Sequence, residues 1–405
     1  MPSRRVAPSL LAACFALSLC ACTEKKAEPE ATKPAAVEAP KPPPPPAPAP
    51  AKVERALKEC AAPVEIAAAT AVKVGDRDAK SAGYKLTFEG KKADGQLVLG
   101  VLGPINEDSG QNMLALKKYV KFFEEDKADA IIVTGDVGEV ADGIARVLKV
   151  LAETKLPVLV VIGNRECRAE FTDGVNLAKK EFSNIINLSE TRAVEFPELT
   201  IVSLPGYHDP SYIPCATGCQ YFKSTVDEVI SMAKEAKRPV MMVAHGPPHG
   251  DGSQALDYAS AGGNVGDPEE NRAIREGNIA FGVYSNIKEA GGRATSDAAG
   301  TTQLKQATPS KTLYLNPGPA DTMGWELNDG TKSVGLAATV TLKDGQASFK
   351  LLRAKPMTPA EKADAKKLDP PARPGAEGKE GADTGAPVPD KAAEGAKVPA
   401  PDSKK

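Results

Sequence analysis

Short apolar runs alternate with amphipathic stretches along residues 51–355 of this 405-residue chain. Gly, Pro, Asn and Asp bound the runs, as is typical of strands between turns, whereas the longer stretches repeat their apolar positions with the helical period. Strands are predicted at 64–74, 84–88, 96–102, 130–133, 156–162, 185–188, 199–204, 240–244, 279–284 and 313–315, and helices at 113–123, 144–151, 172–182 and 226–236. A Gly- and Asp-rich loop is expected before residue 279. The alternation indicates an α/β layer architecture that closes with a hairpin, 334–342 and 347–352, around Asp344-Gly345.

Polar side chains follow three of these strands directly. Asp136 follows the strand at 130–133, Asn164 follows 156–162, and His245 follows 240–244. Ligands bind at the carboxyl ends of strands in open α/β sheets, so these side chains are expected to gather at one edge. Carboxylate, amide and imidazole groups are suitable ligands for a divalent metal. The alternative is that Asp136 caps a helix beginning near Glu139.

Four motifs in this order resemble the calcineurin-like metallophosphoesterase family. They are Gly135-Asp136, Gly163-Asn164-x-Glu166, His245-Gly246-Pro247-Pro248 and Asn316-Pro317-Gly318, and the resemblance covers residues 95–350. It implies a four-layer αββα sandwich with two metal ions at the strand ends. It also implies hydrolysis of phosphate esters by a metal-activated hydroxide.

The chain departs from the family pattern at five positions. Pro104 and Asn106 stand where the family has Asp-x-His, and Val283 and Ser285 replace two further His ligands. Arg165 replaces the His that protonates the leaving group. Losing a general acid costs on the order of 10²- to 10⁴-fold in rate, so ordinary two-metal hydrolysis is not expected.

The resemblance assigns roles to the motif residues that remain. Asp136 corresponds to the acid that bridges the two metals, and Asn164 and His245 correspond to ligands of the second metal. These three residues could hold one divalent ion, Mn, Fe or Zn, or none. Arg165 could grip a phosphate or carboxylate as a catalytic substitute for the His; the alternative is a surface Arg paired with an acid.

Two further histidines could contribute to such a site. His208 lies in a predicted loop and could supply a ligand or a proton donor, the alternative being a solvated loop residue. His249 and Asp251 could replace lost ligands, although the rigid Pro247-Pro248 pair is expected to turn them away.

The N-terminus carries the features of an export signal. Residues 1–22 combine two arginines, an apolar segment too short to cross a bilayer, and the sequence Leu19-Cys20-Ala21-Cys22. The small residues before Cys22 resemble a bacterial lipobox, which makes Cys22 the expected lipidation site. By resemblance to other lipoproteins, Thr23 points to the outer membrane.

Composition divides the rest of the chain into three parts. Residues 23–55 are rich in Pro and Ala and predict an extended tether, residues 56–355 form the metallophosphoesterase-like domain, and residues 356–405 form a disordered tail. The formal net charge of −2, which loss of Arg4 and Arg5 would change to −4, does not suggest a nucleic-acid partner.

Four cysteines remain in the exported part of the chain, an even number that predicts disulfides in an oxidising compartment. Cys215 and Cys219 could pair locally and leave Cys60 for Cys167, although three pairings are open. A metal site built from these thiols is the less favoured interpretation because a second Cys-x-x-Cys pair is lacking.

Together these features predict an envelope lipoprotein, anchored to the membrane, with a degenerate phosphoesterase domain. Such a domain would bind a phosphorylated small molecule or an envelope protein. Two alternatives stay open: a divergent hydrolase that uses one metal, and a structural envelope protein whose tails contact other envelope components.

Overall fold

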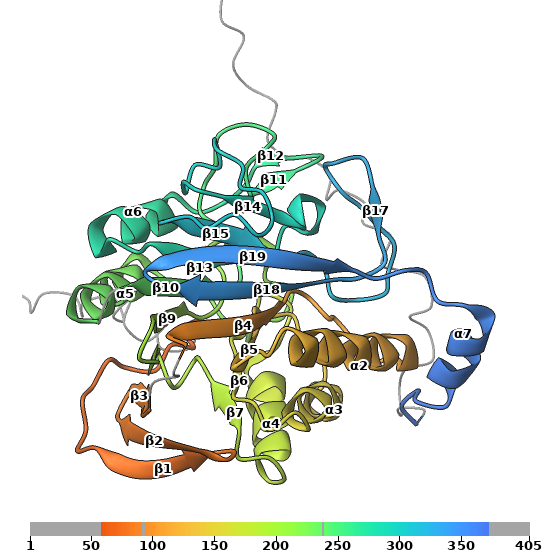
Figure 1. Cartoon of the computed structure of the whole chain (residues 1–405), viewed down its shortest axis with the longest axis horizontal. Coiled ribbons are helices and arrows are strands. Elements are labelled where there is room, and N and C mark those ends of the chain that lie inside the picture. The colour runs from red at the N-terminus through yellow and green to blue at the C-terminus, as the bar shows by residue number, and fades with distance from the viewer. Residues whose placement is uncertain (1–57, 91–93, 237–238, 372–405) are drawn as a thin grey trace, which may run out of the picture. The chain divides into compact units, whose positions relative to one another are not determined.

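The computed structural model describes residues 58–90, 94–236 and 239–371, and its strands form two large sheets (Figure 1). The predicted signal, Cys22, the whole predicted tether and most of the predicted tail therefore lie outside the described residues. Within the described part, no helix is long and apolar enough to span a bilayer.

The first sheet has six strands in the order β19-β18-β4-β5-β6-β7. Four of them run parallel: β4 (Gln96–Leu102), β5 (Ala130–Val133), β6 (Val158–Val160) and β7 (Ile185–Asn187). The predicted hairpin, β18 (Leu336–Lys343) and β19 (Gln346–Arg353), adds two antiparallel strands, with Asp344 and Gly345 at φ 51° and 72° in its turn. All four residues of β5 are buried, as expected where both faces of a parallel sheet are covered.

The second sheet has nine strands in the order β1-β2-β3-β8-β9-β10-β13-β15-β14. Its central strands, β9, β10, β13 and β15, run parallel. The bounds are β1 (Thr70–Val74), β2 (Arg77–Ala82), β3 (Lys85–Phe88), β8 (Ala193–Glu195), β9 (Thr200–Leu204), β10 (Val240–Ala244), β13 (Phe281–Val283), β14 (Arg293–Thr295) and β15 (Leu313–Asn316).

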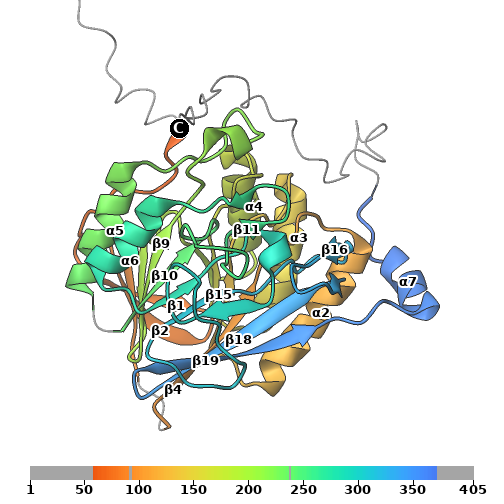
Figure 2. The same cartoon turned by 90° about the horizontal axis from the view of Figure 1, so that it is seen from above.

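Three apolar clusters hold the sheets and helices together as four layers. Leu99 and Ile132 of the first sheet pack with Val243 and Leu315 of the second to form the core between the sheets. Helices α2 (Gly110–Glu125), α3 (Ala141–Ala152) and α4 (Arg168–Lys179) cover the outer face of the six-stranded sheet. Helices α5 (Lys223–Glu235) and α6 (Pro268–Gly277) cover the nine-stranded sheet (Figures 1 and 2). The predicted αββα sandwich is confirmed.

Several small elements differ from the sequence prediction. Strands β2, β8 and β14 and helix α6 were not predicted, and the strand expected from residue 64 begins only at Thr70. Helix α6 lies inside the expected loop. It is polar and only 10 residues long, but Asp267 caps it and Pro268 occupies its first turn, which are signals of a helix start. Minor elements are η1 (Pro210–Tyr212), β11 (Tyr258–Ala259), β12 (Gly263–Asn264), η2 (Lys288–Ala290), β16 (Trp325–Glu326) and β17 (Lys332–Ser333).

The folded part extends beyond residue 355, so the predicted start of the tail is wrong. Helix α7 (Pro359–Lys366) begins with a capping box and packs on α2 (Figure 1). Lys118 of α2 pairs with Glu361 at 2.6 Å, and the backbone N–H of Gly110 donates to Asp369 at 2.7 Å. The sequence of this helix has a low apolar content and was therefore assigned to the tail. The structure attaches it to α2 through the polar contacts just given.

Two disulfides link the cysteines of the domain, Cys60 with Cys219 and Cys167 with Cys215. The local pairing of Cys215 with Cys219 is therefore wrong. A β-bridge between Cys167 and Gly218 brings the loop that follows η1 and carries Cys215 to the start of α4, where Cys215 meets Cys167. Cys219 instead points into the core and is fully buried.

Candidate functional site

The three predicted ligand residues meet at the carboxyl ends of β5, β6 and β10. His245 Nε2 lies 2.9 Å from Asn164 Oδ1 and 3.3 Å from Asp136 Oδ1. All three side chains are buried. The topology brings them together because β5 and β6 are neighbours in one sheet and β10 lies in the facing sheet.

Glycines allow the loops that carry these residues to approach each other closely. Gly135 has φ 100°, and Asp136 itself is left-handed at φ 54°. A Cβ on Gly163 would lie 2.4 Å from Asp136 Oδ1. Helix α3 has Val140 as its N-cap, so the interpretation of Asp136 as a helix cap is wrong. Its carboxylate turns inward and accepts a hydrogen bond from the backbone N–H of Arg165 at 3.2 Å.

Hydrogen bonds define the proton positions on His245. Its Nδ1 lies 2.8 Å from the carbonyl of Thr134, which can only accept, so Nδ1 carries a proton. Asn164 Nδ2 donates to the carbonyl of Tyr212 at 2.6 Å, which turns its Oδ1 toward His245. Nε2 thus faces two acceptor oxygens and needs either a second proton or a cation there.

Electrostatics agree with a positive charge at this point. Burial lowers the pKa of His245, but Asp136 and Glu166 outweigh burial and raise it above its ordinary value. Burial raises the pKa of Asp136, yet His245, Lys288 and the Arg165 N–H outweigh burial and bring it to about 2. The carboxylate is therefore ionised at neutral pH.

Glu166 joins the two ligand-bearing loops from beneath. Its carboxylate accepts the backbone N–H groups of Val137 at 2.6 Å and Gly163 at 3.0 Å, and the residue is fully buried. Burial and the nearby Asp136 raise its pKa to about 7. Glu166 therefore positions the loops.

The side chains at the replaced ligand positions are engaged elsewhere. Val283 packs in the core between the sheets. Ser285 bonds Thr134 through their hydroxyls at 2.6 Å, and both are buried. These positions offer no ligands that would complete the family's set.

A second polar cluster, which the sequence did not predict, surrounds Asn106. Its other members are Asp321, Trp325 and Lys288. Asp321 accepts from Asn106 Nδ2 and, at 2.8 Å, from Trp325 Nε1. Lys288 is 9% exposed, and its ammonium lies 4.0 Å from the centre of the Trp325 ring. Its charge lowers the pKa of both Asp136 and Asp321. A lysine thus supplies a cation beside the position of a lost ligand.

The remaining candidates lie at the rim or apart from the site. Arg165 pairs with Glu139 at 2.9 Å, as in the surface-pair alternative. His208 is half-buried between the rings of Tyr207 and Tyr221 at centroid distances of 4.5 and 6.4 Å, so it is not a solvated loop residue. His249 and Asp251 are exposed.

The central donors fit one divalent ion. Nitrogen and oxygen ligands bind such ions at about 2.0–2.2 Å, so two ligands of one ion lie about 3 Å apart or slightly more. The 2.9 and 3.3 Å separations around His245 Nε2 have this size. Asn164 contributes an amide oxygen, so only two of the three donors are His, Cys, Asp or Glu side chains. No group of three such side chains suited to a metal occurs in the described residues.

Comparison with known proteins places this geometry in a family. Residues 108–279 match the family model described as calcineurin-like phosphoesterase, a segment that contains Asp136, Asn164 and His245. No curated protein matches the chain.

Similar solved structures include three from different organisms. TT1561 of Thermus thermophilus is 14% identical, with 63% of this chain and 98% of that chain covered and a TM-score of 0.41. GAP50, the anchor in the inner membrane complex of Plasmodium, is 11% identical, with 69% of this chain and 98% of that chain covered and a TM-score of 0.39. A dimetal phosphatase from Danio rerio is 12% identical, with 64% of this chain and 99% of that chain covered and a TM-score of 0.38. On the strength of the family match, the chain contains a calcineurin-like phosphoesterase domain.

Proposed function

We propose that this domain is a degenerate phosphoesterase that holds at most one divalent ion and serves as a ligand- or partner-binding module. The observation that carries the proposal is the small donor set. Asp136, Asn164 and His245 converge. At the replaced positions, Val283 packs in the core, Ser285 bonds Thr134, and Asn106 donates its amide to Asp321 in a separate cluster. Two-metal hydrolysis needs a pair of ions to stabilise the attacking and leaving oxygens. Asp136, Asn164 and His245 supply a binding position for one such ion.

The retained residues are arranged to bind an anion next to that place. A bound divalent ion would add positive charge and open coordination positions for an oxygen ligand. Thr134 and Tyr212 hold the His245 ring and the Asn164 amide in their orientations. Lys288 contributes a second positive charge near Asp136. A phosphorylated small molecule is therefore the favoured ligand class.

A one-metal hydrolase is the second candidate, and the donor spacing around His245 supports it. One ion with three protein ligands and an open position can activate water. Arg165 would then act as the cation that grips the phosphate. The ion pair of Arg165 with Glu139 places its guanidinium at the rim of the site.

Metal analysis and hydrolysis of 4-nitrophenyl phosphate, with and without Mn²⁺, distinguish the two candidates. We expect no more than one Mn²⁺ per chain and no Mn²⁺-dependent turnover above buffer. Asp136→Asn removes the only carboxylate ligand and should weaken Mn²⁺ binding by more than about 100-fold, because even loss of a supporting residue costs about 10- to 100-fold.

Glu139→Gln makes the same acid-to-amide change at the rim and serves as the control. It should leave Mn²⁺ binding unchanged. Two ions per chain would contradict the proposal. Turnover that Mn²⁺ stimulates and that Asp136→Asn abolishes, while Glu139→Gln retains it, would establish the hydrolase instead.

We further propose that the chain is an outer-membrane lipoprotein anchored through Cys22, with an envelope protein or phosphorylated compound as partner. The two disulfides support export because such bonds persist in oxidising compartments. In a Gram-negative host, the Cys22→Ser chain should lose the lipid mass on its N-terminal peptide and leave the membrane fraction. Membrane association that survives this change would contradict the anchor.

A further inference from the structure

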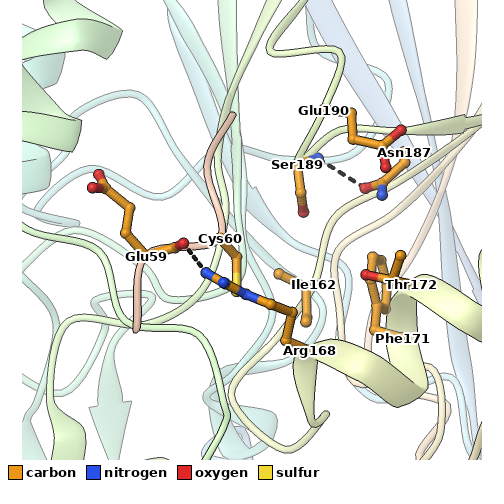
Figure 3. Close-up of a pocket in the computed structure, with 9 residues that line it drawn as sticks. All are labelled: Glu59, Cys60, Ile162, Arg168, Phe171, Thr172, Asn187, Ser189 and Glu190. Carbon is orange, nitrogen blue, oxygen red and sulfur yellow. Dashed lines mark hydrogen bonds between the residues drawn. The ribbon is translucent and has the colours of Figure 1, made fainter. Parts of the chain in front are cut away.

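A second pocket opens at the same edge of the six-stranded sheet, beyond the carboxyl ends of β6 and β7. It has a volume of about 240 Å³ and lies beside the start of α4 and the Cys60–Cys219 disulfide (Figure 3). Ile162 and Phe171 give it an apolar wall, and polar side chains complete the lining. None of the Asp136, Asn164 and His245 side chains lines it.

A buried hydroxyl without a partner points into this pocket. Ser189 is 6% exposed, and its Oγ makes no hydrogen bond within the described part of the chain. Figure 3 shows the hydroxyl directed into the cavity. Beside it, the Oδ1 of Asn187 accepts from the Ser189 backbone at 2.9 Å, and Asn187 Nδ2 has no partner among the described residues. Buried polar groups are normally hydrogen-bonded, so the Ser189 hydroxyl is suited to a ligand, and Asn187 Nδ2 offers a further donor beside it.

Arg168 brings an oriented positive charge to the opposite wall. Its Nε donates to Cys60 Sγ at 3.1 Å, and its Nη2 donates to the carbonyl of Glu59 (Figure 3). These bonds hold the guanidinium in place, and Nη1 keeps its donors because it has no hydrogen-bond partner in the described ranges. Since Arg168 is the first residue of α4, the helix N-terminus adds to the positive potential.

Glu190 provides a negative charge at another part of the lining. Its carboxylate forms no ion pair or hydrogen bond with any described residue, Arg168 included. The pocket therefore has separate positive and negative groups, with neutral hydroxyl and amide groups between apolar walls. Its volume of about 240 Å³ lies below the range of about 300–1,000 Å³ for drug-sized ligands, which favours a small ligand over a nucleotide or a peptide of several residues.

We propose that this pocket binds a small zwitterion of the amino-acid class. The ligand carboxylate binds Arg168 Nη1, its ammonium faces Glu190, and Ser189 and Asn187 bond its polar atoms. This inference goes beyond the proposed function and does not depend on it, since the pocket shares no residue with the metal ligands.

The test is a saturation-transfer NMR screen of the common amino acids against the full chain, followed by titration of the strongest binder. We expect saturable binding that falls at least tenfold for its methyl ester, which lacks the carboxylate, and for its 2-hydroxy analogue, which lacks the ammonium. Ser189→Ala should lower the affinity about 5- to 10-fold, the effect of one hydrogen bond. Arg168→Gln should lower it further.

Thr200→Val is the matched control, because Thr200 Oγ1 is also buried without a partner in the described ranges but lies on β9 outside the pocket. It should leave binding unchanged. Ser189→Ala keeps the protein testable even if Arg168→Gln unfolds it. The proposal is overturned if no amino acid binds at about 10 mM, if Ser189→Ala binds like the wild type, or if the methyl ester or the 2-hydroxy analogue binds equally well.

Discussion

Replacing Cys60 and Cys219 together by alanine should lower the free energy of unfolding by about 5 kcal/mol. This disulfide joins residues 159 apart in the sequence, and a cross-link restricts the unfolded chain more as the loop it closes becomes longer. It also attaches the N-terminal segment, whose Glu59 carbonyl accepts from Arg168, to the domain. Denaturant unfolding of the oxidised proteins, followed by circular dichroism, measures the change.

The second disulfide supplies the comparison. Cys167 and Cys215 are 48 residues apart, so their double alanine variant should lose about 4 kcal/mol, roughly 1 kcal/mol less than the first. A larger loss from this pair than from Cys60–Cys219 would contradict the loop-length argument. It would then be local packing at the start of α4, where Cys167 is the N-cap, that dominates.

The sheet strands were the most predictable part of the fold. Strands β4, β5 and β10 begin and end where the sequence predicted, because strands buried on both faces appear as unbroken apolar runs. The rule that ligands gather at the carboxyl ends of parallel strands brings Asp136 and Asn164 together in one sheet, and His245 joins them from the carboxyl end of β10 in the facing sheet. These predictions depend on one local pattern and one topological rule.

The groups that complete the site were not predictable in the same way. Lys288 and Trp325 belong to the short elements η2 and β16, and Asp321 lies in a connection; none of them is part of an apolar period, and their contacts depend on how these segments fold back. Ser189 likewise appears ordinary in the sequence, and only its burial without a partner among the described residues distinguishes it. The cysteine pairing depends on a bridge between residues 51 positions apart, Cys167 and Gly218. Long-range packing decides all of these features.

Asp321, which accepts from Asn106 at a replaced ligand position, affects the free energy of unfolding through its raised pKa. Burial raises its pKa to about 6, against the opposing effects of Lys288, Trp325 and Asn106. An unfolded Asp titrates near about pH 3.9. Between about pH 4 and 6 the folded chain therefore holds a proton that the unfolded chain has lost, so this group lowers stability as the pH rises through that window. Above about pH 6 the loss is complete, at most about 3 kcal/mol for a shift of about two pKa units.

Asp321→Asn should consequently stabilise the domain by about 2–3 kcal/mol at about pH 7.5 and leave it unchanged near pH 3.5. The amide can keep accepting from Trp325 and the Met323 backbone through Oδ1, and its NH₂ can donate to Asn106, whose Oδ1 is buried without a described partner. Urea unfolding from pH 3.5 to 8 measures the effect. The matched control is Asp329→Asn, because Asp329 is partly exposed, pairs with Arg353 and has a lowered pKa. The control should not gain stability at any pH. An Asp321→Asn protein that is less stable than the wild type at pH 7.5 would mean that the ionised Asp321 is a favourable partner of Lys288, as a carboxylate kept for a bound cation would be.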